Sequence, residues 1–272
     1  MSTSMAQQQT RVFITGGASG LGLAIAQVCL QQGWKVCVGD LAATPTQELK
    51  TAPPEQFIYQ RCDVTQEADL QAAADHLQQQ WGGIDVLINN AGVAQVGAID
   101  DVSMQDWRWI MDINLLGVVA GCKAFTPLLK AQGQGHIVNI ASMAGLLDVA
   151  NMSSYNVSKA AVVSLSETLQ NELLPFGIHT TVVCPSFFRT NLGDSMRSTV
   201  PGMDKTLDKL MNKSELSADD IAQRIILAIE RQTFYLLPHK QGRRLWLLKR
   251  FLPRNWYLRL MQRGGKPGGK KR

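Results

Sequence analysis

Residues 11–40 read RVFITGGASGLGLAIAQVCLQQGWKVCVGD, and this stretch decides the fold. Its first five residues, Arg11–Thr15, form an apolar run that predicts a buried strand. A glycine-rich turn follows, and the amphipathic stretch Leu21–Gln32 predicts a helix. A second apolar run, Lys35–Asp40, predicts another strand. A strand, a helix and a strand in this order indicate a βαβ unit with parallel strands.

The same alternation continues along the chain to residue 238. Further short runs rich in Val and Ile predict strands, and these lie at 56–61, 84–89, 136–141, 178–184 and 234–237. The stretches with helical periodicity lie at 68–81, 104–129, 154–174 and 218–231. We therefore expect an α/β fold, a single Rossmann-type doubly wound parallel sheet of about seven strands flanked by helices. Ligands of such a sheet bind at the carboxyl ends of its strands.

Length and composition favour one main domain. The chain has 272 residues, of which 45% are hydrophobic and 18% charged, and no Pro/Gly/Ser-rich linker interrupts residues 11–238. We expect a polar leader at 1–10, one domain at 11–239 and a separate tail at 240–272. Residues 186–215 have few apolar anchors and are expected to form a mobile substrate lid, with an ordinary surface connection as the alternative.

The cysteines and histidines show no pattern of a metal or redox site. Cysteines stand at 29, 37, 62, 122 and 184, several of them inside apolar runs where cysteine packs as a small hydrophobic residue. Histidines stand at 76, 136, 179 and 239, without partners at ligand spacing. We expect no metal and a reducing, cytoplasmic setting. The first residues lack a secretory-signal pattern, and no apolar run reaches the roughly 20 residues of a membrane span.

The glycine-rich turn is typical of a dinucleotide site. In the segment TGGASGLG at 15–22, the glycines allow the backbone to approach a pyrophosphate at the positive end of a helix. Asp40 ends the second strand 18 residues after Gly22, where a carboxylate can accept both ribose hydroxyls of NAD. Asp40 would repel a 2′-phosphate, and neither Ser19 nor Leu41 is basic. The sequence therefore predicts NAD rather than NADP, against the alternative of a glycine turn without a ligand.

Two further segments are expected to line the same pocket. Asp63-Val64 follows the third strand and is placed to contact adenine. Asn89-Asn90-Ala91-Gly92 follows the fourth strand, where small residues leave room for the cofactor. An unliganded turn is the alternative for the second segment, because Asn and Gly tolerate left-handed backbone geometry.

Four polar residues suggest acid–base chemistry. Tyr155 and Lys159 are four positions apart on a predicted helix, so their side chains share a face. A phenol with a pKa of about 10 is a weak base at neutral pH, but a neighbouring ammonium and a positive nicotinamide favour phenolate. Ser142 follows the fifth strand and can hydrogen-bond a substrate oxygen. The amide of Asn114 can hold a water that links Lys159 to solvent. Each residue alone has a structural alternative: Tyr155 and Lys159 as a pair on a solvated helix face, Ser142 as a cap of the next turn, and Asn114 as a partner of the backbone. Together, the four residues indicate catalysis.

On these residues the chain resembles the short-chain dehydrogenase/reductase family, over about residues 11–238. The resemblance implies that Ser142 positions the substrate and Tyr155 exchanges the proton. It also implies that Lys159 binds the nicotinamide ribose and lowers the pKa of Tyr155, and that Asn114 sustains a proton relay. Family members usually form dimers or tetramers through the helices expected here at 104–129 and 154–174.

One departure from the family pattern lies after the sixth strand, where Pro185-Ser186 replaces a common Pro-Gly. Thr190 still stands where the family contacts the carboxamide of nicotinamide. The residues expected to bind the cofactor are Gly16, Ala18, Ser19, Gly20, Leu21, Gly22, Asp40, Leu41, Asp63, Val64, Asn90, Ala91, Gly92, Tyr155, Lys159, Pro185 and Thr190.

These features predict an NAD-dependent oxidoreductase that moves a hydride between nicotinamide and a secondary alcohol or carbonyl of a hydrophobic substrate. The alternative is a non-catalytic NAD-sensing or scaffold protein, because a fold alone does not settle function. A sensor, however, has no chemical need for Tyr155 beside Lys159.

The C-terminal tail differs in charge from the rest of the chain. Residues 240–272 hold 12 of the 27 Lys and Arg and no acid, which leaves 15 basic against 22 acidic residues, or −7, in 1–239. Basic residues alternate with Leu, Trp, Phe and Tyr over 242–261, and Pro253 is expected to divide this stretch into two short helices. Such an amphipathic tail can lie on an anionic surface at the inner face of a membrane. Packing on the protein's own body or on a neighbouring subunit is the alternative, and nucleic acid is disfavoured because no recognition module is present.

Overall fold

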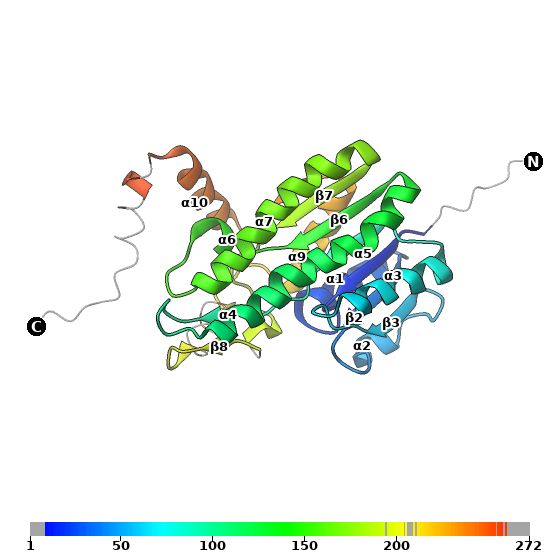
Figure 1. Cartoon of the computed structure of the whole chain (residues 1–272), viewed down its shortest axis with the longest axis horizontal. Helices are drawn as coiled ribbons and strands as arrows, with labels where there is room; N and C mark the ends of the chain where they lie inside the picture. Colours follow the sequence, from blue (N-terminus) through cyan, green and yellow to red (C-terminus); the bar gives the residue numbers. More distant parts are fainter. Residues whose placement is uncertain are drawn as a thin grey trace, which may run out of the picture.

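The computed structural model describes residues 9–193, 195–203, 205, 209, 211–253, 255–257 and 259. Seven parallel strands form one sheet in the order β3-β2-β1-β4-β6-β7-β9 (Figure 1). The strands are β1 (Arg11–Thr15), β2 (Lys35–Asp40), β3 (Phe57–Arg61), β4 (Val86–Asn89), β6 (Gly135–Ile140), β7 (Ile178–Val183) and β9 (Tyr235–Leu236). The predicted doubly wound α/β sheet is confirmed. Its strand order reverses between β1 and β4, which places a ligand crevice at their carboxyl ends.

Helices cover both faces of the sheet. Successive side chains of a strand point to opposite sides, and the apolar strands therefore present an apolar face on each side. Val12 and Ile14 of β1 belong to one core, and Phe13 to the other, where its ring lies 4.8 Å from that of Phe125. The helices of the first face are α1 (Gly20–Gln31) and α9 (Ala218–Glu230). Those of the second are α3 (Glu67–Trp81), the helix that starts at Met104, and α7 (Ser153–Leu173). Other described helices are α2 (Gln47–Lys50), α6 (Ala144–Leu147), η2 (Leu174–Phe176), η3 (Asn191–Gly193) and α10 (Lys240–Phe251).

The long helix expected at 104–129 contains an irregular turn. It runs as α4 (Met104–Met111), the π turn η1 (Asp112–Leu116) and α5 (Gly117–Gln132). It is the one helix in the described part of the chain whose length and hydropathy would allow it to cross a membrane. Here it packs against α3, α7 and the sheet, with Ile110 and Phe125 fully buried, as core helices do.

A second, two-stranded sheet attaches the middle of the expected lid to the body. It pairs β5 (Gln95–Val96) with β8 (Arg197–Ser198). The Arg197 guanidinium lies 3.9 Å from the ring centroid of Trp109 and 2.7 Å from the carboxylate of Asp106 on α4. Parts of the expected segments fall outside the described residues: 1–8 of the leader, 194, 204, 206–208 and 210 of the lid, and 254, 258 and 260–272 of the tail.

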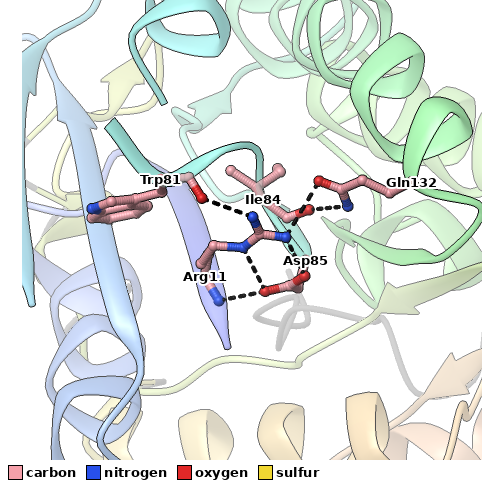
Figure 2. Close-up of polar contacts among 5 residues, drawn as sticks. All are labelled: Arg11, Trp81, Ile84, Asp85 and Gln132. Atoms are coloured by element: carbon pink, nitrogen blue, oxygen red, sulfur yellow. Dashed lines mark hydrogen bonds and ion pairs between the residues drawn. The ribbon is translucent and has the colours of Figure 1, made fainter. Parts of the chain in front are cut away.

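Arg11 joins several elements at the amino ends of β1 and β4 (Figure 2). Its guanidinium donates to Asp85 Oδ1 at 2.7 Å and Oδ2 at 3.0 Å, and to the carbonyl oxygen of Trp81 at 2.9 Å. Gln132 accepts from the same guanidinium at 3.3 Å and donates to the carbonyl oxygen of Ile84 at 2.6 Å. The network therefore ties the ends of α3 and α5 to the edge of the sheet opposite the ligand crevice.

We expect Asp85→Ala to lower the free energy of unfolding by about 2–3 kcal/mol, because it leaves the buried Arg11 guanidinium without its carboxylate. Asp85→Asn retains the shape and one acceptor oxygen, and should cost less. Urea denaturation measures both changes. An unaltered unfolding midpoint in Asp85→Ala would show that the pair contributes nothing to stability.

Candidate active site

The glycine-rich turn connects β1 to α1 at the carboxyl edge of the sheet. Gly16 and Gly20 have φ angles of +63° and +53°, which side-chain-bearing residues rarely adopt. A Cβ on Gly22 would lie 2.2 Å from the carbonyl oxygen of Gly16, so the turn and helix pack this closely only through glycine. Ser19 caps α1 without a side-chain hydrogen bond. The positive end of α1 is therefore available to an anion.

Asp40 lies beside this turn at the end of β2. Its Oδ2 accepts a hydrogen bond from the N–H of Ala18 at 2.9 Å, and its Oδ1 one from Ala42 at 3.1 Å. Leu41, the next residue, is 60% exposed. The predicted cofactor selector thus also holds the glycine turn in place, a structural role that the sequence analysis did not predict.

The segment after β4 lies against the same turn. Thr15 Oγ1 accepts from the N–H groups of Asn90 at 3.0 Å and Ala91 at 3.1 Å. The amide of Asn90 donates to the carbonyl oxygens of Thr15 at 3.0 Å and Gly16 at 2.9 Å. These bonds hold the two expected cofactor-binding segments together as one unit. Asn89 points the other way, into the core, where its amide donates to Asn139 at 2.9 Å.

The loop after β3 is also internally ordered. The Asp63 carboxylate accepts from the N–H of Thr65 at 2.9 Å, and the Asp63 N–H donates to Asp69 at 2.9 Å. Val64 is buried and lies against Gly117 at the start of α5. The loop is therefore held at the carboxyl end of β3, on the side of the sheet that carries α5.

Tyr155, Lys159 and Ser142 come together where α7 passes the end of β6. Tyr155 is 7% exposed and Lys159 is 4% exposed. Lys159 Nζ lies 5.9 Å from the ring centroid of Tyr155 and donates to the carbonyl oxygen of Ile140 at 2.9 Å. The side chain of Ser142 lies within hydrogen-bonding reach of the Tyr155 hydroxyl. Three of the four expected catalytic residues thus lie together, with Tyr155 and Lys159 buried and Ser142 half-buried.

Burial controls the ionisation of this cluster. It raises the pKa of Tyr155, and the hydrogen bond from Ser142 opposes this shift only in part. It lowers the pKa of Lys159 to about 8. Both directions arise because transfer out of water disfavours the charged form of each group. Lys159 is not among the causes of the Tyr155 shift, so the expectation that Lys159, together with a bound nicotinamide, lowers the pKa of Tyr155 stays a prediction.

Asn114 lies in the π turn η1 and is fully buried. Its Oδ1 accepts from the N–H of Val93 at 2.8 Å. Its Nδ2 donates to the carbonyl oxygen of Val93 at 2.9 Å and to Ser158 Oγ at 3.1 Å. Both amide protons are thus taken by protein acceptors, and a water held by this amide would have to donate to Oδ1, which lies close to Gly92. The expected water link between Asn114 and Lys159 stays a prediction.

The loop after β7 contacts Ser142 and is held by a histidine that the sequence analysis missed. The carbonyl oxygen of Pro185 accepts from the N–H of Met143 at 2.9 Å and lies 3.5 Å from Ser142 Oγ. The N–H of Ser186 donates to Nδ1 of His239 at 3.1 Å, although the two residues are 53 positions apart. His239 Nε2 lies 3.4 Å from Oγ of Ser214 in the expected lid. No sequence spacing signals this contact.

The remaining expected residue of this loop, Thr190, accepts a hydrogen bond at Oγ1 from the N–H of Leu192 at 3.3 Å. Thr190 lies near the start of the expected lid, 186–215. Within the described residues, no group of three or more His, Cys, Asp and Glu is arranged to hold a metal ion. All five cysteines are buried as free thiols.

The lowered pKa of Lys159 predicts how its replacement affects stability. Between pH about 8 and 10.5 the unfolded chain holds a proton on Lys159 that the folded chain has released, so stability rises with pH in this window. At lower pH the folded protein bears the full cost of a buried charge. We expect Lys159→Met to raise the free energy of unfolding by about 1–3 kcal/mol near neutral pH, and this gain to shrink as the pH rises toward about 10.

Urea denaturation at several pH values measures this effect. Lys123→Met, which replaces an exposed lysine paired with Glu67, is the matched control and should show no such pH dependence. A gain in Lys159→Met that is independent of pH would show that packing, rather than charge, is its cause.

Comparisons with known proteins identify the family to which this site belongs. A family model described as short chain dehydrogenase matches residues 10–201, a range that includes the glycine turn, Asp40 and the Tyr155 cluster. The 2-(R)-hydroxypropyl-CoM dehydrogenase of Xanthobacter autotrophicus is 33% identical over 229 residues, which cover 81% of this chain and 92% of that protein. The 3-alpha-(or 20-beta)-hydroxysteroid dehydrogenase of Mycobacterium tuberculosis is 34% identical over 181 residues, 66% of this chain and 70% of that protein.

Among solved structures, a short chain dehydrogenase/reductase from Burkholderia phymatum in complex with NAD is similar to this chain with a TM-score of 0.83. The two sequences are 30% identical, and the match covers 98% of this chain and 100% of that one.

Proposed function

The chain belongs to the short-chain dehydrogenase family of oxidoreductases, and from this premise we propose that it transfers a hydride between NAD and a secondary alcohol or carbonyl of a hydrophobic substrate. One observation carries the proposal. Tyr155 and Lys159 are buried beside Ser142 at the same edge of the sheet as the glycine turn and Asp40. A proton-exchanging group and a dinucleotide cradle thus meet at one crevice.

The residues present fit NAD. The close packing of Gly16 and Gly22 and the uncapped start of α1 suit a pyrophosphate, and the Asp40 carboxylate suits the hydroxyls of a ribose. Asp40 and the apolar Leu41 offer no attraction to a 2′-phosphate, which supports NAD over NADP. The relative from Burkholderia phymatum was solved with NAD. When bound, NAD supplies the hydride acceptor of the reaction.

The chain's own residues then handle the substrate and its proton. Ser142 hydrogen-bonds the substrate oxygen and keeps it next to the phenolic oxygen of Tyr155, which takes the proton as phenolate during oxidation and gives it back as phenol during reduction. The positive charge of Lys159, with its Nζ 5.9 Å from the ring centroid of Tyr155, stabilises the phenolate against the cost of burial. Asn114 acts as a positioning residue, because its amide links Val93, next to Gly92, to Ser158, next to Lys159.

An apolar surface beside Tyr155 supports a hydrophobic substrate. Tyr155 forms a buried cluster with Ala94, Ile110 and Ala144. Leu192 and Met196 from the expected lid pack against this cluster, as do Val93, Trp109, Met111 and Met152. A substrate that reaches the Tyr155 hydroxyl would therefore meet apolar side chains from both the body and the lid. The similarity to a hydroxysteroid dehydrogenase is consistent with this chemistry.

The proposal is tested by following NADH formation with purified protein across alcohols of graded length and ring content, with NADP in parallel. We expect turnover with NAD to rise with the hydrophobicity of the alcohol. Measurable NAD binding without turnover across the panel would favour the non-catalytic NAD-sensing alternative.

We also propose a cytoplasmic homo-oligomer. The free, buried thiols are consistent with a reducing compartment. Three large apolar side chains are exposed along α4, η1 and α7, namely Met104 at 65%, Leu116 at 53% and Val157 at 48%. These helices are the ones through which the family resemblance implies dimers or tetramers, and light scattering on the full chain gives the mass that tests it.

A further inference from the structure

The basic tail comprises residues 240–272, and one side of its described part packs against the rest of the protein. Trp246 of α10 packs against the main core, with its ring 5.3 Å from that of Tyr235. Lys249 donates to the carbonyl oxygen of Leu146 at 2.7 Å and forms an ion pair with Asp148. Tyr257, beyond the helix, is buried. This part of the tail therefore follows the alternative in which its aromatic residues cover the chain's own surface.

The outer side of the same helix presents exposed apolar residues. Leu247, Leu248 and Phe251 are 37%, 41% and 77% exposed, and their spacing of three and four residues places them on one stripe of α10. Trp256, shortly after the helix, is 67% exposed. Figure 1 shows α10 at one end of the molecule, beyond α6 and away from α1 and α3. The stripe is thus accessible to a large, flat partner.

Basic residues flank this stripe. Arg243, Arg244 and Arg250 are exposed on α10, and Arg243 and Arg244 form no ion pair with any described residue. The tail from 240 onward has 12 basic residues and no acid, whereas residues 1–239 carry 15 basic and 22 acidic residues. An anionic surface would attract the tail and repel the body, and so would orient the protein with α10 toward it.

We propose that this surface, formed by Leu247, Leu248, Phe251, Trp256 and the arginines of α10, docks the protein on anionic lipid bilayers. The aromatic and aliphatic side chains enter the headgroup region, and the arginines contact lipid phosphates. The positive charge of the tail favours a lipid bilayer over a second copy of the same surface as the partner. In a two-fold symmetric contact, two such tails would repel each other. Docking does not depend on the proposed oxidoreductase function.

The position of α10 gives docking a consequence for the active site. A Cβ on Gly242 would lie 3.0 Å from Cγ of Met143, the residue after Ser142. The docked helix therefore lies against the segment that carries Ser142 and leads into α6. If the proposed function holds, a hydrophobic alcohol dissolved in the bilayer would have a short path to Tyr155.

Co-sedimentation of the full chain with vesicles tests the proposal. One set of vesicles contains phosphatidylcholine alone, and the other also contains phosphatidylglycerol. We expect binding to the anionic vesicles only, and its loss near 1 M NaCl, where the Debye length falls to about 3 Å. Point variants are preferable to removal of the tail, because Trp246 and Tyr257 support the body.

Two double variants remove the two contributions separately. Phe251→Ser with Trp256→Ser removes exposed apolar area, and Arg243→Glu with Arg244→Glu reverses charge. Each is expected to weaken binding to the anionic vesicles about tenfold or more. The matched controls are Phe176→Ser and Arg231→Glu, which change exposed residues outside the tail and should bind as the unmodified chain does.

Three results would overturn the proposal. These are no vesicle binding by the unmodified chain, equal binding by the tail variants and their controls, or equal binding to vesicles with and without phosphatidylglycerol. A drop in oligomeric mass of the tail variants, without vesicle binding by the unmodified chain, would assign the surface to a subunit contact instead. NADH formation is measured separately, without vesicles, so a failure of the proposed function is distinguished from a failure of docking.

Discussion

Tyr155→Phe is expected to lower kcat by about 10²–10⁴-fold while leaving the Kd for NAD nearly unchanged. Phenylalanine preserves the ring that packs with Ala94, Ile110 and Ala144, and it removes only the hydroxyl that reaches Ser142. The loss should therefore fall on proton exchange rather than on folding or cofactor binding. Steady-state rates with the best alcohol of the panel, together with a fluorescence titration of NAD, measure the two quantities.

Tyr235→Phe is the matched control, because it deletes a tyrosine hydroxyl that contacts Glu167 on the outer part of α7. It should retain full turnover. If Tyr155→Phe also retained full turnover, Tyr155 would have no part in the chemistry. The buried cluster would then be structural, and the NAD-sensing alternative would gain weight.

Asp40→Ala is expected to lower kcat/KM with NAD by about 10²–10⁴-fold, because two ribose hydroxyls lose their acceptor, and to shift the NAD to NADP preference as well. Each hydrogen bond between a ribose hydroxyl and a carboxylate contributes about 1.5–3 kcal/mol, and the repulsion of a 2′-phosphate disappears with the charge. Because Asp40 also accepts from the N–H of Ala18, part of the loss with NAD will come from a less ordered glycine turn.

Asp40→Asn separates these two effects, since it removes the charge and retains one oxygen for Ala18. Initial rates with both cofactors and the urea unfolding midpoint are measured for each variant. If the urea unfolding midpoint fell while the ratio of kcat/KM with NAD to kcat/KM with NADP stayed the same, Asp40 would only support the glycine turn.

The sheet and the glycine turn were predictable because local signals specify them. The predicted bounds of β1 and β2, Arg11–Thr15 and Lys35–Asp40, are those of the structure. Buried parallel strands appear in a sequence as continuous apolar runs, and here Gly or Asp ends these runs sharply. The helix at Ser153–Leu173 was placed to within one residue for a similar reason, since its apolar spacing is regular.

Features that depend on distant partners were not predictable. The two-residue strand β8 and the ion pair of Arg197 with Asp106, 91 positions away, leave no periodic signal. The raised pKa of Tyr155 follows from its burial, which side-chain type and spacing do not reveal. The hydrogen bond of His239 to Ser186 likewise joins two loops that only the folded sheet brings together. The catalytic roles of Ser142, Tyr155 and Lys159 stay predictions until the variants are measured.

The π turn η1 gives the long helix two registers instead of one. A π turn holds an extra residue relative to an α turn, so side chains beyond Leu116 are rotated by about 100° from where a continuous α-helix would place them. This offset lets Trp109 stack against Arg197 of the expected lid while Phe125 still stacks on Phe13 in the sheet. Deleting one residue within η1 would yield a more regular helix but would rotate one of these two side chains out of its contact. At this segment, regular α-helical hydrogen bonding is therefore less favourable for the folded protein than the π turn, because only the π turn allows both tertiary contacts.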